Sequence, residues 1–286
     1  MFLKQFSLLI ALLFTSAFAF AKPSADFILG SDTPLENPHD IKLSPNGNYL
    51  FVADVGNNRV VILDPKTLEL ISTFGSDHQD GTHDIDFDKQ GNAYVADTHN
   101  GRVTIYKMSG TNAQLIGELN EKISGPEGVL VHPNGNIYVA GAWSNNLVIY
   151  KDGKVIKEIT DLSKPHDIEL APNGNMWLSD SGNNRMLLLS PELKILKEWQ
   201  GSPFDFNGVR YQDVLANGTV IAADKNNHQV KVFDQNGKPL LTLGMTLAGK
   251  GANKFRTPEG IEVRGNVLWI ADSGNNRIVK YQLNLD

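Results

Sequence analysis

Short runs of alternating apolar and polar residues recur along the chain at intervals of about forty residues. In one copy the runs are "DIEL", "MWLSD", "RMLLLS" and "KILKEW", each long enough for one strand. Turns such as "APNGN" and "SGNN" separate them, and their Asn and Gly residues tolerate the left-handed backbone of tight turns. Each copy therefore predicts four antiparallel strands. A helical solenoid is excluded, because it would need long stretches with a period of 3.6 residues.

The pattern occurs six times. The copies begin at or near the following residues: Pro38, Thr82, Pro126, Pro165, Asn207 and Pro258. Four-stranded repeats of this length are typical of the blades of a β-propeller. The last copy ends after three strands, and the segment Asp26–Gly30 resembles the fourth strand of the other copies. We therefore expect an all-β, six-bladed β-propeller in which this N-terminal strand joins the last blade and closes the ring, because closure removes the exposed strand edges.

The first 21 residues have the pattern of a secretory signal peptide. Lys4 is basic, Leu8–Phe14 is almost entirely apolar, and Ala19-Phe20-Ala21 matches an A-x-A cleavage site. A membrane anchor is the alternative, but the apolar run is short for a span of about 20 residues. We expect a cleaved signal peptide over residues 1–21 and one propeller domain over residues 22–286. The expected location is the periplasm or the extracellular medium, without membrane attachment after cleavage.

Composition narrows the classes of partner and site. The 286-residue chain has no cysteine, which excludes a disulfide framework, a thiolate metal site and a lipidated N-terminal cysteine. Its formal net charge is −6, whereas binding to nucleic acid by counterion release requires a basic surface. We therefore expect no nucleic-acid partner, and we expect a monomer.

One position, just before the innermost strand of each blade, gathers ionisable residues. In blade order it holds His39, His83, Glu127, His166, Asn207 and Glu259. Arg210 is an alternative in the fifth blade, because extra residues precede its Asn-Gly turn. All six positions should lie around one mouth of the central channel. Imidazole and carboxylate groups bind zinc, manganese or ferrous iron, or form an acid–base pair. The alternative is that this position is merely exposed and tolerates polar side chains.

The Asn-Asn-Arg turns of the blades resemble the NHL-repeat family of six-bladed propellers over the whole of residues 22–286. The "PHDI" words at residues 38–41 and 165–168 further resemble the peptidyl-α-hydroxyglycine α-amidating lyases. That resemblance implies a catalytic zinc held by three histidines from alternate blades. The matching set here is His83, His166 and Glu259, with His39 as a fourth ligand or an orienting group. The tyrosine and arginine of those lyases have no counterpart, since Trp143 stands at the tyrosine position and the early strand ends "FVAD".

Further residues around the mouth are given roles by their place in the repeat. We expect Asp84 and Asp167 to orient the neighbouring ligands and His99 to lean over the mouth, so these three form the candidate catalytic set. The candidate face for a substrate or partner consists of Glu127, Trp143 and Asn207. Aspartates and arginines recur in nearly every second turn, as in Asp54 and Arg59. We expect them to be structural, the aspartate capping its turn and the arginine linking blades.

Three functions remain open at this point. The first is a lyase-like enzyme that uses a divalent metal, zinc before calcium, on a small molecule or peptide at the channel mouth. The second is a non-catalytic platform that binds a protein or peptide. The third is a calcium-dependent lactonase or esterase using Glu127, Asn207 and Glu259, although histidines are poor ligands for calcium.

Overall fold

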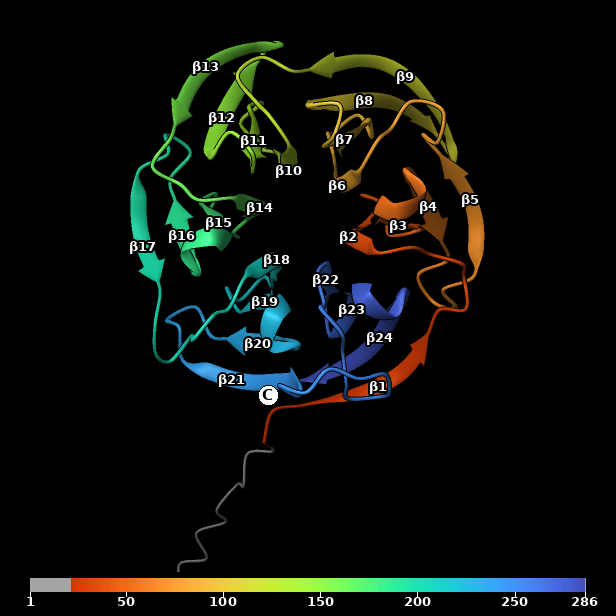
Figure 1. Cartoon of the computed structure of the whole chain (residues 1–286), viewed down its shortest axis with the longest axis vertical. Coiled ribbons are helices and arrows are strands. Elements are labelled where there is room, and N and C mark those ends of the chain that lie inside the picture. Colours follow the sequence, from red (N-terminus) through yellow and green to blue (C-terminus); the bar gives the residue numbers. More distant parts are fainter. Residues whose placement is uncertain (1–21, 286) are drawn as a thin grey trace, which may run out of the picture.

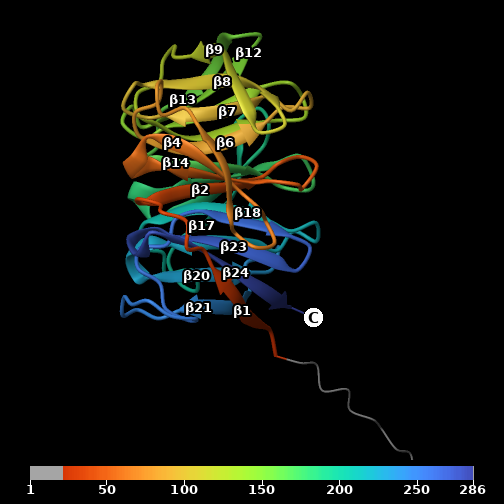
Figure 2. The ribbon, with the colours of Figure 1, turned by 90° about the vertical axis from the view of Figure 1, so that its right-hand side faces the viewer.

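The computed structural model describes residues 22–285. They form a ring of six four-stranded antiparallel sheets around a central axis (Figure 1). Seen from the side, the ring is a disc with turns on both faces (Figure 2). The predicted all-β, six-bladed propeller is confirmed. The expected signal peptide, residues 1–21, lies outside the described residues, and within residues 22–285 no helix is long and apolar enough to cross a membrane.

In blades one to five the strands run outward from the axis in chain order, and blade six has the first strand of the chain as its outermost strand. The innermost strands are β2 (Pro38–Leu43), β6 (Thr82–Phe87), β10 (Pro126–Val131), β14 (Pro165–Leu170), β18 (Val209–Val214) and β22 (Ile261–Arg264). The second strands are β3 (Leu50–Asp54), β7 (Ala93–Asp97), β11 (Ile137–Gly141), β15 (Met176–Asp180), β19 (Val220–Asp224) and β23 (Val267–Asp272). The third strands are β4 (Arg59–Leu63), β8 (Arg102–Ser109), β12 (Asn146–Lys151), β16 (Arg185–Leu189), β20 (Gln229–Phe233) and β24 (Arg277–Asn284).

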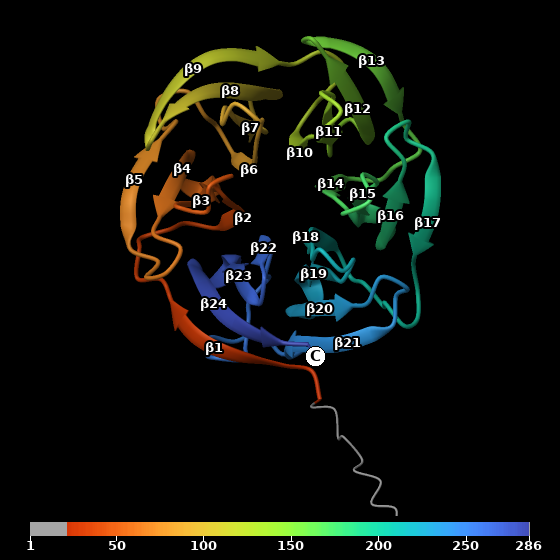
Figure 3. The ribbon, with the colours of Figure 1, turned by 180° about the vertical axis from the view of Figure 1, so that it is seen from behind.

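The outermost strands are β5 (Leu70–Phe74), β9 (Asn112–Leu119), β13 (Lys154–Ile159), β17 (Ile195–Trp199), β21 (Pro239–Gly244) and β1 (Ser24–Gly30). Single 3₁₀ turns follow four of the second strands: η1 (Val55–Asn57), η2 (Ser181–Asn183), η3 (Lys225–Asn227) and η4 (Ser273–Asn275). Blade six combines the two ends of the described chain, as Figure 3 shows. Its outer strand β1 pairs antiparallel with β24, with Ser24 opposite Asn284 and Gly30 opposite Val279.

The apolar core lies between neighbouring blades. Every residue of β3 is buried, because both faces of this strand pack against a sheet, whereas β5 at the rim is mostly exposed. Trp177 and Trp199 of blade four pack with Phe233 of blade five, and Trp269 of blade six packs in a cluster with residues of blade one. The core therefore holds each pair of blades together and leaves the axial ends of the inner strands free for polar residues.

The recurring aspartates join each turn to the segment that leads into the same blade. Asp54, fully buried, accepts the backbone N–H of Glu36 at 2.7 Å through Oδ1. Its Oδ2 accepts hydrogen bonds from Asn57 at 2.9 Å and from Arg59 at 2.8 Å. The aspartate does not cap its own 3₁₀ turn, and Arg59 bonds the carbonyl of Pro34 rather than another blade. The structural role expected of these residues stands, but the arginine is not the link between blades.

An asparagine at the end of the turn makes that link. Asn58 adopts the left-handed conformation, with φ of 53°, and its Oδ1 accepts the N–H of Gly81 in the next blade at 2.8 Å. Asn184 bonds Gly208 in the same way at 2.7 Å. Asn276 bonds the N–H of Asn37 at 2.9 Å and so joins blade six to blade one. The "GNN" words are therefore a repeated hydrogen bond between blades, placed by a backbone conformation that asparagine tolerates.

Candidate active site at the channel mouth

Strand register defines the ring of residues at the mouth. Pro38, Pro165 and Val209 lie opposite Asp54, Asp180 and Asp224 respectively, so they are equivalent residues of their blades. The next residues are therefore equivalent too, and the ring consists of His39, His83, Glu127, His166, Arg210 and Glu259. In blades one to five a register shift follows this point, a bulge that re-aims side chains at the start of the strand.

Blade five contributes Arg210, not Asn207. The backbone N–H of Asn207 bonds Asp224 at 2.7 Å, which is the bond that Glu36 makes with Asp54. Asn207 therefore lies in the segment before the strand. Of the two alternatives for this blade, the structure selects Arg210, because the Asn-Gly pair precedes β18 rather than beginning it.

Three ring residues converge on one point. One ligand atom each from His39, His166 and Glu259 lies within 4.8 Å of the others, and all three side chains are buried. Nε2 of His39 is 3.9 Å from Oε1 of Glu259, and Nε2 of His166 is 3.8 Å from Oε2. His83 lies beside this group, with its ring centroid 4.5 Å from that of His39 and 6.5 Å from that of His166. The group comes from blades one, four and six rather than from alternate blades.

The ring contains buried polar atoms without hydrogen-bond partners. Glu259 is 1% exposed, and neither of its carboxylate oxygens has a hydrogen bond; Nδ1 of His39 has none either. Lys225 and Arg210 offset the charge, with Nζ of Lys225 2.5 Å from Oε1 and Nε of Arg210 3.7 Å from Oε2. Two imidazoles and a carboxylate are a donor set that zinc accepts. They fit a divalent ion, with two competing cations: Lys225, a quarter exposed, and Arg210, whose Nη1 lies 2.7 Å from Nδ1 and 3.1 Å from Nε2 of His166.

Burial shifts the ionisation of the mouth towards neutral side chains. Desolvation lowers the pKa of His39, His83 and His166 well below the ordinary value for histidine, and the positive charge of Arg210 adds to this for His39 and His166. Neutral imidazole is the form that binds a metal ion. Burial also raises the pKa of Glu127 to about 7, against the opposing charge of Arg210. A carboxyl group with this pKa can take up and release a proton near neutral pH.

The orientation of His83 is set by its surroundings. Nδ1 of His83 lies 2.8 Å from the carbonyl oxygen of Gly81, so this nitrogen carries the proton and donates it. The Oγ1 of Thr98 is also 2.8 Å from Nδ1 and donates its own proton to the carbonyl of Pro126. The other nitrogen of His83, Nε2, therefore has a free lone pair.

Tyr211 forms a floor beneath the ring. Its side chain, 1% exposed, crosses the channel from blade five, and its hydroxyl lies 3.0 Å from the carbonyl oxygen of His83 and 3.1 Å from that of Glu127. Tyr211 thus lies across the channel beneath the mouth residues, and the ring together with this floor is here called the cup. Neither Tyr211 nor the placement of Arg210 followed from the repeated words, but aligning "VRYQDV" on "PHDIEL" residue by residue identifies both.

The two candidate orienting aspartates join adjacent inner strands. Oδ2 of Asp84 accepts the N–H of Val129 at 2.5 Å, and Oδ2 of Asp167 accepts that of Gln212 at 2.9 Å. Burial raises the pKa of Asp84 to about 8. Over residues 22–285 neither carboxylate has a hydrogen bond to a mouth histidine. Their part in orienting ligands stays a prediction.

His99 and Trp143 lie at the rim, in the turns of blades two and three. Nδ1 of His99 is 3.0 Å from Oδ1 of Asp80, and its ring is 6.4 Å from that of His83. Trp143 is 56% exposed, and its ring is nearly parallel to that of His99, with an interplanar angle of 20° and centroids 5.8 Å apart. The roles predicted for His99 in catalysis and for Trp143, Glu127 and Asn207 in binding are not decided by these positions.

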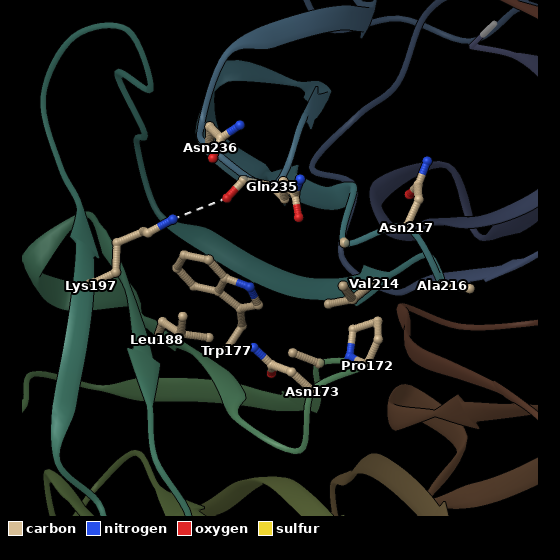
Figure 4. Close-up of a pocket in the computed structure, with 12 residues that line it drawn as sticks. Pro172, Asn173, Trp177, Leu188, Lys197, Val214, Ala216, Asn217, Gln235 and Asn236 are labelled. Carbon is tan, nitrogen blue, oxygen red and sulfur yellow. Dashed lines mark hydrogen bonds between the residues drawn. The ribbon is translucent and has the colours of Figure 1, made fainter.

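A pocket of about 320 Å³ opens on the opposite face, between blades four and five (Figure 4). Trp177 lies at its centre, with Lys197 donating a hydrogen bond to the carbonyl of Gln235 at 3.0 Å. The amide oxygens of Asn173 and Asn217 accept N–H groups of their own turns. None of its lining residues is a histidine or an acid, so it has no donor set like that of the mouth.

Comparison with known proteins supports the fold and the repeat. The NHL repeat matches residues 255–281, in blade six, and the LVIVD repeat matches residues 39–64, in blade one. A stretch of 90 residues is 32% identical to NHL repeat-containing protein 2 of Gallus gallus. This match covers 30% of the chain and only 12% of the length of that relative.

Several solved structures share the architecture. A catalytically inactive histidine-to-alanine variant of virginiamycin B lyase from Staphylococcus aureus, with quinupristin, is 15% identical with a TM-score of 0.65, over 92% of this chain and 100% of that one. A streptogramin B lyase is 14% identical with a TM-score of 0.66, over 92% and 98%. A protein of unknown function from Bacteroides thetaiotaomicron is 17% identical with a TM-score of 0.74, over 89% and 71%. At these identities the likeness is one of fold. The chain is thus a six-bladed β-propeller whose last blade matches the NHL repeat.

Proposed function

We propose that the channel mouth binds one divalent metal ion, zinc in the first place, and is the active site of a lyase. The carboxylate of Glu259 carries this proposal, because it is buried and faces Nε2 of both His39 and His166. Its oxygens have no hydrogen bond, and only the partly exposed cations Lys225 and Arg210 offset its charge. Burying such a group costs free energy unless something binds it. Polar groups retained at that cost are expected at functional sites.

The reaction class is taken from the resemblance to the peptidyl-α-hydroxyglycine α-amidating lyases, and the groups around this centre could perform it. A metal ion held there would stabilise negative charge on a substrate oxygen. Glu127, with a pKa of about 7, is the candidate base. For an N-acylated α-hydroxyglycine it takes the proton of the hydroxyl group, the C–O bond becomes C=O, and the C–N bond breaks with its electron pair moving to nitrogen. Glu127 returns the proton to that nitrogen, giving an amide and glyoxylate. Arg210 and Lys225 would attract the carboxylate of the substrate.

Two further observations support a lyase. Arg210 and Tyr211 bring to the mouth the side-chain types that the amidating lyases use, although from blade five. Tyr211 acts here as the floor, since its hydroxyl lies on two backbone carbonyls. Structural neighbours include virginiamycin B lyase, of which a histidine-to-alanine variant is catalytically inactive. We place this activity in a monomer in the periplasm or extracellular medium.

Metal binding is tested first. Protein purified without chelators should contain about one zinc ion per chain by elemental analysis, as the single donor set requires. Glu259→Gln and His166→Ala should each lose the ion. His78→Ala, which removes an exposed histidine outside the ring, should retain it and serves as the matched control. Absence of zinc, manganese and calcium binding in titrations of the EDTA-treated protein would overturn the metal site.

Activity is tested separately. Peptides ending in α-hydroxyglycine should release glyoxylate in the presence of the zinc-loaded protein. Glu127→Gln should lower kcat by about 100-fold, a typical effect of losing a general base, while retaining the metal. Retained activity in this variant would remove Glu127 from the mechanism.

A binding platform is the second candidate. Lys225 and Arg210 already offset the charge of Glu259, and Trp143 is largely exposed on the same face. This function predicts no metal and a protein or peptide partner that is lost in Trp143→Ala. A rise in melting temperature with calcium but not zinc would instead favour the calcium-dependent hydrolase.

A further inference from the structure

Three blades lack glycine at one turn position on the mouth face, and two of these three have an aromatic ring there. The second residue after the second strand is glycine in blades one, four and six: Gly56, Gly182 and Gly274. The equivalent residues of blades two, three and five are His99, Trp143 and Asn226. Large aromatic rings therefore occur in two neighbouring blades only.

A glycine lies beneath each of these two rings. A Cβ atom on Gly125 would lie 2.3 Å from Cγ of Trp143, and one on Gly81 would lie 2.9 Å from the ring of His99. Blades one, four and six have Asn37, Lys164 and Thr257 at the equivalent position. These three residues adopt positive φ of 51°, 46° and 44°, close to the 56° of Gly125. Glycine is thus not required by the backbone at this position. It provides room for the side chain of the facing turn, which is a ring in blades two and three and the amide of Asn226 above Gly208 in blade five.

The two rings form one surface, here called the aromatic shelf and consisting of His99 and Trp143. Their planes differ by 20° and their centroids are 5.8 Å apart. Trp143 is 56% exposed and the side chain of His99 is 48% exposed, so one side of the shelf faces solvent. His99 is 6.4 Å from His83, whose ring is 4.5 Å from that of His39. The shelf is therefore continuous with the cup.

The opposite side of the cup is cationic. Arg210 and Lys225 both come from blade five, which lies across the axis from blade two (Figure 1). Their side chains reach Glu259 and are 22% and 25% exposed. A ligand spanning the mouth would thus meet an aromatic surface at one end and positive charge at the other.

We propose that the aromatic shelf is a subsite for a flat aromatic side chain of a ligand whose carboxylate lies against Arg210 and Lys225. Rings stack on exposed indole faces, and opposite charge selects the carboxylate. The ligand is a small peptide or acylated amino acid. Its last unit carries the carboxylate, and the residue before that unit is aromatic. This proposal names a substrate class for the proposed lyase. It rests on the proposed function only for the position of the amide that reacts.

Binding is measured with three probes by titration calorimetry: N-acetyl-phenylalanyl-glycine, N-acetyl-alanyl-glycine and N-acetyl-phenylalanyl-glycinamide. The first should bind about tenfold more tightly than each of the other two, as loss of one stacking contact or one charge contact implies. Trp143→Ala should remove the preference for phenylalanine and leave the alanyl probe unchanged. Trp143→Phe should restore most of it. Met245→Ala, which removes an exposed apolar residue on the outer side, should change nothing.

The outcomes separate the subsite from the lyase. Selective binding without glyoxylate release supports the subsite and overturns the lyase. Glyoxylate release with equal rates for phenylalanyl and alanyl substrates overturns the subsite and supports the lyase. Equal affinity for the three probes, unchanged selectivity in Trp143→Ala, or no binding of any probe at millimolar concentration overturns the subsite. A protein partner that competes only at Trp143 would also overturn it, in favour of the platform.

Discussion

The channel contains ionisable residues at two depths, and the two groups differ in how completely their polar atoms are hydrogen-bonded. The mouth ring holds His39, His83, Glu127, His166, Arg210 and Glu259. Three residues further along the inner strands lies a deeper cluster: Lys42, Asp86, Glu169, Asp213 and Glu262. Asp86 accepts the N–H of Val131 at 2.7 Å and Asp213 that of Val263 at 2.6 Å, while Lys42 pairs with Glu169.

The difference lies in what remains unbonded. Over residues 22–285, no member of the deeper cluster has a buried polar atom without a hydrogen bond, whereas His39, Glu127, Arg210 and Glu259 of the mouth do. Two of the deeper carboxylates, Asp86 and Asp213, join neighbouring blades, and Glu169 is paired with Lys42. The mouth retains capacity to bind something else. Ionisable residues in a channel therefore do not by themselves indicate a site; unused hydrogen-bonding capacity does.

The largest expected effect is in the deeper cluster. Lys42→Met should lower the free energy of unfolding by about 3 kcal/mol at pH 8, because it leaves buried carboxylates without their cation. The loss should be smaller at pH 5, since burial raises the pKa of Asp86 to about 6 and that of Asp213 to about 7, and both are then neutral. Urea unfolding at the two pH values measures this. An equal loss at both would mean that Lys42 acts through packing.

Removal of one carboxylate that joins two blades should have a smaller effect. Asp84→Ala should lower stability by about 2 kcal/mol, because the buried N–H of Val129 loses its acceptor. Asp84→Asn keeps an acceptor and should lower stability less, with unchanged zinc affinity. If Asp84→Asn kept its stability but bound zinc about tenfold more weakly, then Asp84 would orient a ligand as first expected.

The pH dependence of stability should separate the two depths in chelator-treated protein. A raised carboxyl pKa means that the folded state binds more protons, so this contribution is full below about pH 4 and is gone above the folded pKa. The contribution of Asp213 to stability is lost by about pH 7, and that of Asp84 by about pH 8. The lowered histidine pKa values act oppositely, and their contribution is lost as pH falls below about 6.5.

Stability should therefore fall by about 2–3 kcal/mol from pH 6.5 to pH 8.5. Asp213→Asn should reduce the loss of stability between pH 6.5 and pH 8.5. His166→Gln should reduce only the loss of stability that occurs as the pH falls below about 6.5. If either variant changed the stability equally in the acid and the alkaline range, the residues at the two depths would not be independent.

The smallest effect is expected at the mouth itself. Glu259→Gln should leave stability unchanged or raise it by up to about 1 kcal/mol, because it removes a buried charge without hydrogen bonds. Thermal unfolding of the metal-free variant checks this. A loss above 2 kcal/mol would place Glu259 with the deeper cluster, as a structural group paired with Lys225.

The blade pattern in the sequence was sufficient to predict the propeller, because turn words and strand lengths repeat. It also placed three histidines and two glutamates at one mouth. It could not select His39 over His83 for the converging group, since that depends on the bond between Nδ1 of His83 and the carbonyl of Gly81. Lys225 was missed for a related reason: its position in the turn holds small residues in most other blades, and only its length carries it to Glu259.

The pairing of β1 with β24 has a consequence for how the chain folds as it is synthesised. Blade six needs residues near both ends of the sequence, with Ser24 opposite Asn284. The earlier blades can form from contiguous segments while translation proceeds, but β1 remains without its partner until the last strand has emerged. Ring closure is therefore a late, long-range step, and before it the chain presents two unpaired strand edges that require protection from other chains.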